Sequence, residues 1–403
     1  MQYFKGKHIL IIVENLPLPF DRRVWQEANT LKSYGAEVSI ICPRMKGYTK
    51  KYEEINGIHI YRHPLPSEGR RGLGYLVEYS AAIFWEFFLS WKIFFKKRFQ
   101  VIQGCNPPDL IFLTALFFKL MGVKYIFDHH DINPELYVAK FGKKGFFYRL
   151  MVLFERLTFA TANYSIATNE SYKEIAVRRG KMKQDKVTIV RSGPSLDRLK
   201  ITPGNIKYRK GRKYLVGYVG VIGEQEGLDL LLEAVKIITG KTTEVQFAIV
   251  GGGTDLEKIK KLSKEMGLSD YVDFYGRVPD EDLIDILNTA DLCVNPDKPT
   301  EMNNLSTMNK IMEYMALKKP IVQFDLKEGR FTARDASLYV ENNDINDFAE
   351  KILWLLDNDK ERVKMGEFGY KRVIHELSWE HESKKLIEFY SRVLSIKNFR
   401  QSS

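Results

Sequence analysis

The chain has 403 residues, of which 44% are hydrophobic and 28% charged, and its formal net charge is +11. This length predicts two domains or more, and the apolar content is ordinary for a soluble globular protein. The three cysteines are far apart and form no Cys-x-x-Cys pair, so buried free thiols and a reducing, cytoplasmic compartment are expected. No signal-peptide pattern opens the chain, and the best apolar stretch, residues 81–95, contains Glu86 and Lys92, which argues against a membrane span.

The charge is unevenly distributed along the chain. Residues 1–195 carry 30 Lys and Arg against 17 Asp and Glu, a net of +13, whereas residues 196–403 carry 32 against 34, a net of −2. The basicity of the first half predicts an anionic partner there, which is a membrane surface, a lipid phosphate or a nucleic acid.

Short apolar runs rich in β-branched residues alternate with helical stretches in both halves. In the first half the predicted strands are residues 8–13, 37–42, 58–61, 124–127, 164–168 and 187–190. In the second half they are residues 214–220, 245–250, 272–276, 291–295 and 320–324. Continuous apolar strands separated by helices are typical of parallel sheets covered on both faces.

A polar, basic segment rich in glycine and proline, residues 193–213, separates the two halves and is expected to be a linker. The predicted organisation is therefore two doubly wound α/β domains, residues 1–195 and 214–379, joined by a linker at 196–213. They should face each other across a cleft. A last helix is expected within residues 380–403.

Two arginines follow the first predicted strand. Arg22 and Arg23 stand near a helix start, where the helix dipole disfavours cations, so they are candidate contacts for an anion. A solvated basic turn explains them about as well.

Aromatic and basic residues are mixed in two stretches of the first half, residues 72–99 and 140–157. This mixture suits an interfacial surface resting on anionic lipid. The alternative is a buried helix with a solvated run of charge. Nucleic acid ranks last, because no helix-turn-helix, zinc or single-strand-binding pattern is present.

The strand at 124–127 is followed by Asp128, His129, His130 and Asp131. A histidine positioned at the edge of a cleft is the preferred interpretation, and a turn with helix-capping aspartates is the alternative. A zinc site is disfavoured, because no further Cys/His cluster is near in sequence and neither Cys42 nor Cys105 has ligand spacing.

Two glycine-rich loops follow strands in the second half, at residues 220–227 and 250–253. Such loops let backbone N–H groups approach a phosphate at a helix N-terminus. Each alone is explained equally well by an ordinary strand-to-helix turn.

The stretch 306–320 predicts an amphipathic helix, with Ser306 or Thr307 as the N-cap. Lys310 falls in its first turn, where the dipole mildly disfavours a cation. A bound diphosphate would explain the lysine, and Glu313 could then accept hydrogen bonds from two ribose hydroxyls. An exposed Lys310–Glu313 pair, worth about 0.2–0.5 kcal/mol, is an equally weighted alternative.

Together these stretches resemble the family 4 glycosyltransferases, which have the GT-B fold of two Rossmann-like domains with a C-terminal helix that crosses back to the first. The resemblance spans nearly the whole chain. Its motifs are "VGYVGVIGEQEGLDLLLEAV", "FAIVGGGTDLEKIKKL", "VDFYGRVPDEDLIDIL", "STMNKIMEYMALKKPIV" and the "HD" and "PE" pairs at 130–131 and 134–135.

The resemblance implies a retaining, metal-independent transferase that needs no cofactor. It implies a nucleotide sugar as the donor, with a UDP-sugar as the first candidate. It implies a lipid-linked or glycan acceptor at the cytoplasmic membrane face. The implied catalytic residues are His130, Asp131 and Lys310. The implied donor residues are Gly220, Gly223, Gln225, Arg277, Val278, Ser306, Thr307, Asn309, Lys310 and Glu313. The implied acceptor residues are Arg22, Arg23, His129 and Glu135.

The chain departs from the family pattern at three positions. Leu305 stands where a first glutamate is usual, and Val221 and Glu226 stand where the phosphate loop usually has Arg and Lys. Two other functions therefore stay open: a nucleotide-sugar epimerase of the same fold, and a non-catalytic partner that binds nucleotide or lipid.

Overall fold

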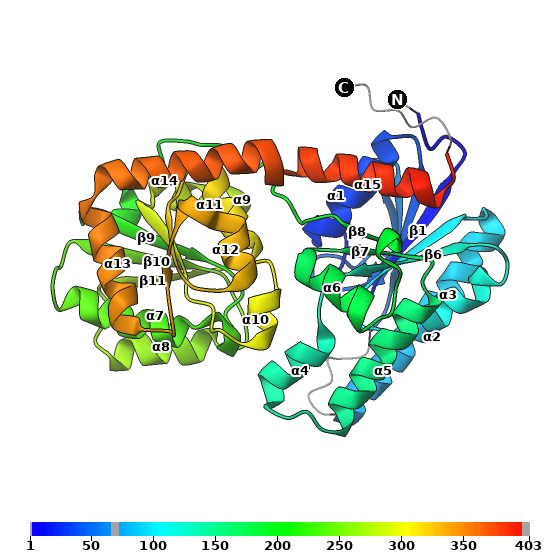
Figure 1. Ribbon diagram of the computed structural model, residues 1–403, viewed down its shortest axis with the longest axis horizontal. Coiled ribbons are helices and arrows are strands. Elements are labelled where there is room, and N and C mark those ends of the chain that lie inside the picture. The colour runs from blue at the N-terminus through cyan, green and yellow to red at the C-terminus, as the bar shows by residue number, and fades with distance from the viewer. Residues whose placement is uncertain (1, 66–71, 397–403) are drawn as a thin grey trace. The chain divides into compact units, whose positions relative to one another are not determined.

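The computed structural model describes residues 2–65 and 72–396. Residues 397–403 of the predicted C-terminal stretch lie outside the described range. The chain divides into two compact units, residues 1–192 with 382–403, and residues 193–381. Each unit is an α/β domain built around one twisted sheet (Figure 1).

The first unit contains an eight-stranded sheet with the order β3-β4-β2-β1-β5-β6-β7-β8. Its strands are β1 (His8–Val13), β2 (Glu37–Pro43), β3 (Tyr52–Ile55), β4 (Ile58–His63), β5 (Val101–Cys105), β6 (Lys124–His129), β7 (Tyr164–Ala167) and β8 (Val187–Ile189). All neighbours are parallel except β3 and β4, which form an antiparallel hairpin at the edge. All six residues of β1 are buried, as expected of a strand covered on both faces.

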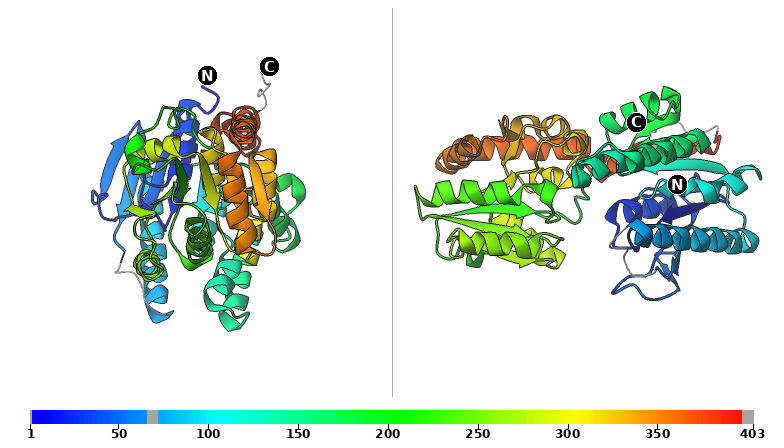
Figure 2. Two further views of the ribbon diagram at one scale, coloured as in Figure 1. Left: turned by 90° about the vertical axis from the view of Figure 1, so that its left-hand side faces the viewer. Right: turned by 90° about the horizontal axis from the view of Figure 1, so that it is seen from below.

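The helices of the first unit are α1 (Arg22–Ser33), α2 (Gly72–Lys96), α3 (Phe112–Lys119), α4 (Asn133–Phe141), α5 (Phe146–Thr161) and α6 (Glu170–Arg178). Asp21 caps α1, because its carboxylate accepts a hydrogen bond from the Val24 amide. Figure 2 shows helices on both faces of each sheet. None of the described helices is long and apolar enough to cross a membrane.

The second unit contains a six-stranded, fully parallel sheet with the order β11-β10-β9-β12-β13-β14. Its strands are β9 (Tyr214–Val219), β10 (Val245–Val250), β11 (Val272–Gly276), β12 (Leu292–Asn295), β13 (Ile321–Phe324) and β14 (Ser337–Val340). Its helices are α7 (Leu228–Thr239), α8 (Leu256–Glu265), α9 (Asp280–Thr289), α10 (Glu301–Leu305), α11 (Asn309–Ala316), α12 (Lys327–Ala333), α13 (Ile345–Asp357) and α14 (Asp359–Arg372). The order reverses between β9 and β12, so the loops after these two strands flank the switch point where such sheets bind ligands.

The predicted strands all exist, but three others were missed: β3, β5 and β14. Each missed strand is short and carries polar residues or glycine within it, as in "YEEI" and "VIQGC", so none reads as a continuous apolar run. The fold class predicted from the sequence, two doubly wound α/β domains, is confirmed by the two sheets.

The segment expected to be a linker, residues 196–213, is instead packed against the second unit. Leu199 and Tyr208 are buried in its core. The Asn288 side chain bonds to the backbone of the segment at two points, the Lys200 carbonyl (2.9 Å) and the Thr202 amide (3.2 Å). Polar composition misled the prediction, because these polar groups are paired rather than solvated.

The last helix, α15 (Trp379–Val393), belongs to the first unit from Glu382 onward. The Glu382 carboxylate accepts a buried hydrogen bond from the Arg191 amide at 2.8 Å, and the Tyr390 hydroxyl donates to the Gln103 side chain. The three cysteines are buried free thiols, as predicted.

Candidate active site

The two glycine-rich loops of the second unit pack backbone against backbone after β9 and β10. A Cβ on Gly251 would lie 1.8 Å from the Gly220 carbonyl oxygen, and one on Gly253 would lie 2.2 Å from that of Ile222. Only glycine fits at these two positions. The predicted loop residue Gly220 is thus held beside the second loop, at the carboxyl end of the sheet, while the Gln225 carbonyl accepts from the Lys298 amide and the Asn303 side chain after β12.

Helix α11 starts later than predicted and has a different cap. Its N-cap is Met308, which offers no side-chain hydrogen bond, and its first residue is Asn309. Ser306 donates instead to the Met302 carbonyl at 2.8 Å, at the end of α10. Met308, rather than Ser306 or Thr307, is therefore the N-cap residue of α11, and its side chain makes no capping hydrogen bond.

Lys310 is the second residue of α11 and is buried. Its ammonium lies 2.8 Å from the carboxylates of both Glu226 and Asp297, and 3.4 Å from the Tyr218 hydroxyl. Burial disfavours a charged lysine, yet Asp297 and its neighbours hold the pKa of Lys310 well above its usual value. The fold therefore uses this cation, so a bound diphosphate is not needed to explain it, and its contact with a donor diphosphate stays a prediction.

The two acids around Lys310 differ in their proton affinity. Burial raises the pKa of Asp297 to about 7. Burial alone would also raise the pKa of Glu226, but Lys310 and hydrogen bonds bring it below its usual range. Near neutral pH the three groups thus carry little net charge, and above it they are net negative.

Glu313 lies three residues further along α11 and faces Arg198, not Lys310. The Arg198 guanidinium donates to Oε1 of Glu313 and lies 3.4 Å from Asp280, the first residue of α9. The exposed Lys310–Glu313 pair considered from the sequence is therefore absent: Lys310 is paired elsewhere.

Three further predicted donor residues lie on the same side of the second unit. The Arg277 side chain packs over Gly252, where an added Cβ would lie 3.3 Å from Arg277 Cγ. Val278 packs against the core beside α9, and Asn309 is exposed at the start of α11. Their roles as donor contacts stay predictions.

In the first unit, Asp128 at the end of β6 is the centre of a buried polar network. It accepts from Arg23 Nη2 at 2.9 Å and from Gln103 Nε2 at 2.7 Å, while His130 Nε2 lies 2.8 Å away. Burial would raise the pKa of Asp128, but Arg23 and His130 hold it far below its usual range. Asp128 therefore stays ionised and fixes both neighbours.

His130 is more exposed than Arg23 in this network, with 14% of its side chain accessible against 8%. Asp128 holds the pKa of His130 above its usual value although burial opposes this. With a proton on Nε2 the ring donates to Asp128, and without it Nε2 can accept from Arg23 Nε at 2.9 Å. The imidazole thus stays oriented in both protonation states.

Asp131 follows at the start of the loop to α4. Its backbone is clamped by Asn106, whose side chain accepts from the Asp131 amide and donates to the Asp131 carbonyl. Burial raises the pKa of its carboxyl group. The loop geometry at 130–131 is therefore fixed by one asparagine after β5, which no sequence pattern singled out.

Three residues predicted to contact an acceptor have structural roles instead. His129 is fully buried among the rings of Phe127, Phe159 and Tyr172, and burial lowers its pKa to about 3. Glu135 is buried in an ion pair with Arg179, and Arg23 is bonded to Asp128 within the buried network. Arg22 is exposed, so its predicted role stays open.

Cys105, Asp128 and His130 bring possible metal-ligand atoms within 4.8 Å of one another. The surroundings do not suit a cation, because Arg23 lies within 2.9 Å of both Asp128 and His130. Burial also raises the pKa of the Cys105 thiol well above its usual value, which disfavours the thiolate that metals bind.

Sequence reasoning missed Arg198, Asp297 and Gln103. Asp297 could have been found, because it lies two residues after β12, at the same edge as the other candidates. Arg198 lies in the segment dismissed as a linker, and Gln103 lies inside a strand that was not predicted.

Two family models match the chain. "Glycosyl transferase 4-like domain" matches residues 21–193, and "Glycosyl transferases group 1" matches residues 205–372. Among curated proteins, the capsular polysaccharide biosynthesis glycosyltransferase CapM of Staphylococcus aureus is 27% identical over 74% of this chain and 78% of its own length.

Two solved structures show the same fold. Sucrose-phosphate synthase from Thermosynechococcus elongatus superposes with a TM-score of 0.78 at 18% identity, over 96% of this chain and 99% of that one. HepE of Anabaena, solved in complex with UDP and glucose, has a TM-score of 0.71 at 14% identity, over 95% and 99% of the two chains. The two family models together account for both units, and the chain belongs to the family 4 glycosyltransferases of GT-B fold.

Proposed function

We propose that this glycosyltransferase moves a sugar from a nucleoside diphosphate sugar to a lipid-linked or glycan acceptor in polysaccharide synthesis. A UDP-sugar is the first candidate for the donor. The transfer would retain the anomeric configuration and need no metal. The proposal that the protein binds a nucleotide-sugar donor rests on one arrangement. Glu313, the α11 N-terminus and the two glycine loops lie at one edge of the second sheet. The similarity to CapM supports the proposed role in polysaccharide synthesis.

The diphosphate would be held mainly by backbone amides. The first turn of α11 offers N–H groups without a side-chain cap, and the loop after β9 offers more. Fixed dipoles of this kind stabilise the charge that develops on the leaving diphosphate. Lys310 would contribute from behind the helix start, with its charge shared between Glu226 and Asp297.

His130 would act as a catalytic residue of the first unit. Its ring is the partly exposed end of a rigid network, so Asp128 and Arg23 can fix its orientation while protonation changes. A positioned imidazole of this kind can bind a sugar hydroxyl or move a proton.

Turnover with donor and acceptor tests this proposal. We expect UDP release from UDP-glucose, UDP-galactose or UDP-N-acetylglucosamine only when a prenyl-diphosphate-linked saccharide is present, at a rate that EDTA leaves unchanged. Proton NMR of the product should show that the anomeric configuration of the donor is kept. Conversion of the donor to an epimer without acceptor would support the epimerase instead. Nucleotide binding with no turnover on any acceptor would support the non-catalytic partner.

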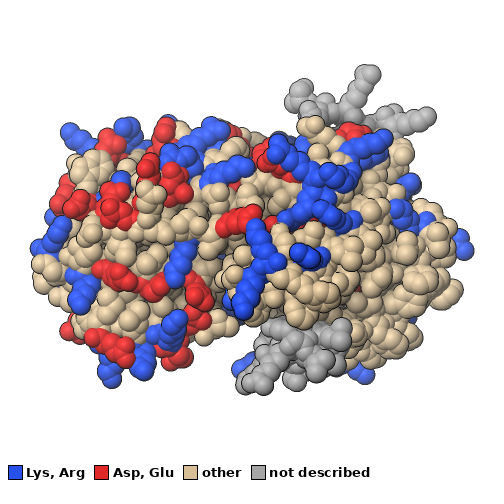
Figure 3. Space-filling model, turned by 60° about the horizontal axis from the view of Figure 1, so that its bottom comes forward, with Lys and Arg blue, Asp and Glu red and all other residues tan. Residues whose placement is uncertain are grey.

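We also propose that the first unit docks on an anionic membrane surface. Phe84, Phe88 and Phe95 of α2 are 52–80% exposed, and Leu120 after α3 is 82% exposed. Helix α3 contacts both α2 and α5. Figure 3 shows a broad area on the right of this face that lacks Lys, Arg, Asp and Glu.

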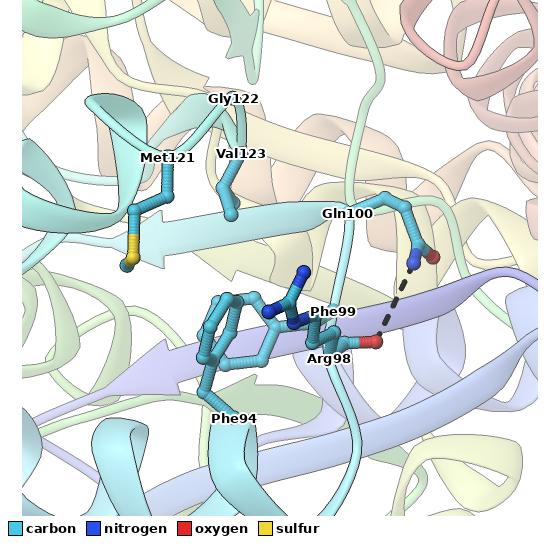
Figure 4. Close-up of a pocket in the computed structure, with 7 residues that line it drawn as sticks. All are labelled: Phe94, Arg98, Phe99, Gln100, Met121, Gly122 and Val123. Atoms are coloured by element: carbon cyan, nitrogen blue, oxygen red, sulfur yellow. Dashed lines mark hydrogen bonds between the residues drawn. The ribbon is translucent and has the colours of Figure 1, made fainter.

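Basic residues border this apolar surface. Figure 4 shows a hollow at the amino ends of β5 and β6, where Arg98 lies beside Phe94 and Met121 lines the other side. The Arg98 guanidinium is 5.7 Å from the centre of the Phe94 ring. Aromatic rings beside exposed cations suit the headgroup region of an anionic bilayer.

Vesicle co-sedimentation checks this docking. Binding to vesicles with phosphatidylglycerol should exceed binding to phosphatidylcholine vesicles and should weaken as salt shortens screening below ~8 Å. The double variant Lys96→Gln, Arg98→Gln should lose part of the salt-sensitive binding. Lys97 is left in place because it pairs with Glu37. The matched control, Lys258→Gln with Lys261→Gln on α8, should bind as the wild type. Equal, salt-insensitive binding to both vesicle types would contradict the proposal.

A further inference from the structure

Arg198 connects two elements of the second unit at the candidate donor site. Its Nη2 donates to Oε1 of Glu313 on α11, and its Nη1 lies 3.4 Å from Oδ1 of Asp280 on α9. The Arg198 and Glu313 side chains are 21% and 16% exposed, so the pair is mostly withdrawn from solvent. Such pairs are screened less by salt than exposed ones.

The backbone that follows Arg198 is fixed at two points. The following residue, Leu199, is 4% exposed and lies in the core cluster that also contains Ile311 and Tyr314 of α11. Further along, the Asn205 amide donates to the Thr289 hydroxyl at 2.7 Å. The guanidinium therefore has a defined position relative to α11, and it does not depend on an unstructured linker.

The contact with Arg198 is compatible with the Glu313 carboxylate also binding a ligand. A guanidinium keeps its charge at every relevant pH, and a carboxylate can accept about four hydrogen bonds. One guanidinium N–H on Oε1 is thus compatible with two further bonds from vicinal hydroxyls. An oriented, ionised acceptor binds hydroxyls more strongly than one that samples several rotamers.

We infer that Arg198 is a positioning residue that holds the Glu313 carboxylate in place for the ribose hydroxyls of the donor nucleotide, and thereby makes the site select ribonucleotides over 2′-deoxyribonucleotides. This inference rests on the proposed function, in which Glu313 binds ribose. It adds a residue from the segment before β9 to the determinants of donor choice.

Paired nucleotide titrations test the inference. Calorimetry would give the dissociation constants of UDP and 2′-deoxy-UDP, with GDP, ADP and their 2′-deoxy counterparts as further probes. In the wild type the preferred ribonucleotide should bind about tenfold or more tightly than its deoxy form, as expected for hydrogen bonds to a charged group. In Arg198→Gln this ratio should fall to about threefold or less, because the carboxylate is no longer held.

Two further variants separate positioning from general stability. Arg198→Lys keeps the charge but not the planar fork, so its ratio should lie between those of the wild type and Arg198→Gln. The matched control is Arg209→Gln, which removes an arginine of the same segment that bonds to Asp291 through both of its Nη atoms. This control should lower stability and leave the ratio unchanged. In a Glu313→Gln background, Arg198→Gln should not change the ratio further.

Three results would overturn the inference. A wild-type ratio retained in Arg198→Gln would show that the guanidinium does not act through Glu313. Tighter nucleotide binding in Arg198→Gln would show that Arg198 competes with ribose. If the wild type binds no nucleoside diphosphate at all, the proposed function fails and the inference fails with it, and this outcome is distinct from the other two.

Discussion

Lys310→Met should lower the free energy of unfolding of the ligand-free protein by about 3–5 kcal/mol, the range for removing one partner of a buried ion pair. The lysine is 9% exposed and forms ion pairs with Glu226 and Asp297, whose side chains are 15% and 1% exposed. Without the ammonium, two acids remain buried side by side, and at least one must take up a proton or open the loop to water. Urea unfolding followed by far-ultraviolet circular dichroism measures the loss.

Second-site changes make this prediction specific. Glu226→Gln together with Asp297→Asn in the Lys310→Met background should restore a large part of the lost stability, because no buried charge is then left unpaired. The matched control is Lys318→Met, which removes an ion pair with Glu367 whose two side chains are 36% and 42% exposed. It should cost no more than about 1 kcal/mol. A Lys310→Met protein as stable as the wild type, with turnover lost, would instead return Lys310 to the role of a ligand contact.

The rule that ligands bind at the carboxyl ends of parallel strands selected candidate residues in each unit from the sequence. It selected the loops after β6, β9 and β10, which carry His130, Gly220 and Gly251, and the segment after β12, which leads through α10 to the start of α11. The rule can be applied to a sequence because strand ends are local features, visible as apolar runs that stop at polar or glycine-rich turns.

Side-chain pairing was less visible, because it joins residues far apart in the sequence. Lys310 pairs with Glu226, which is 84 positions away, and Glu313 pairs with Arg198, which is 115 positions away. From sequence, the neighbours three residues apart looked like partners. In the structure both have stronger partners on other elements, which no helix-periodicity argument can supply.

The two adjacent histidines show a signal that was present but unused. Side chains alternate along a strand, so Phe127 and His129 share one face of β6 while Asp128 and His130 share the other. The ring of His129 accordingly stacks near Phe127, at 5.2 Å between centres, while His130 meets Asp128. Applying this period to "FDHHD" would have separated the core histidine from the site histidine.

The central claim, that the carboxyl edge of the second sheet is a nucleotide site with Glu313 as its ribose contact, is tested most directly by calorimetry of Glu313→Gln with UDP. Hydrogen bonds to a charged group contribute about 1.5–3 kcal/mol, so UDP affinity should fall about tenfold or more. Binding of 2′-deoxy-UDP should fall much less, because part of the contact is already missing.

The control for this measurement is Glu367→Gln on α14. It makes the same substitution at a glutamate that pairs with Lys318, and it should leave UDP affinity unchanged. The account predicts weak UDP binding by Glu313→Gln, normal binding by Glu367→Gln, and normal folding of both. UDP bound by Glu313→Gln as tightly as by the wild type would contradict it.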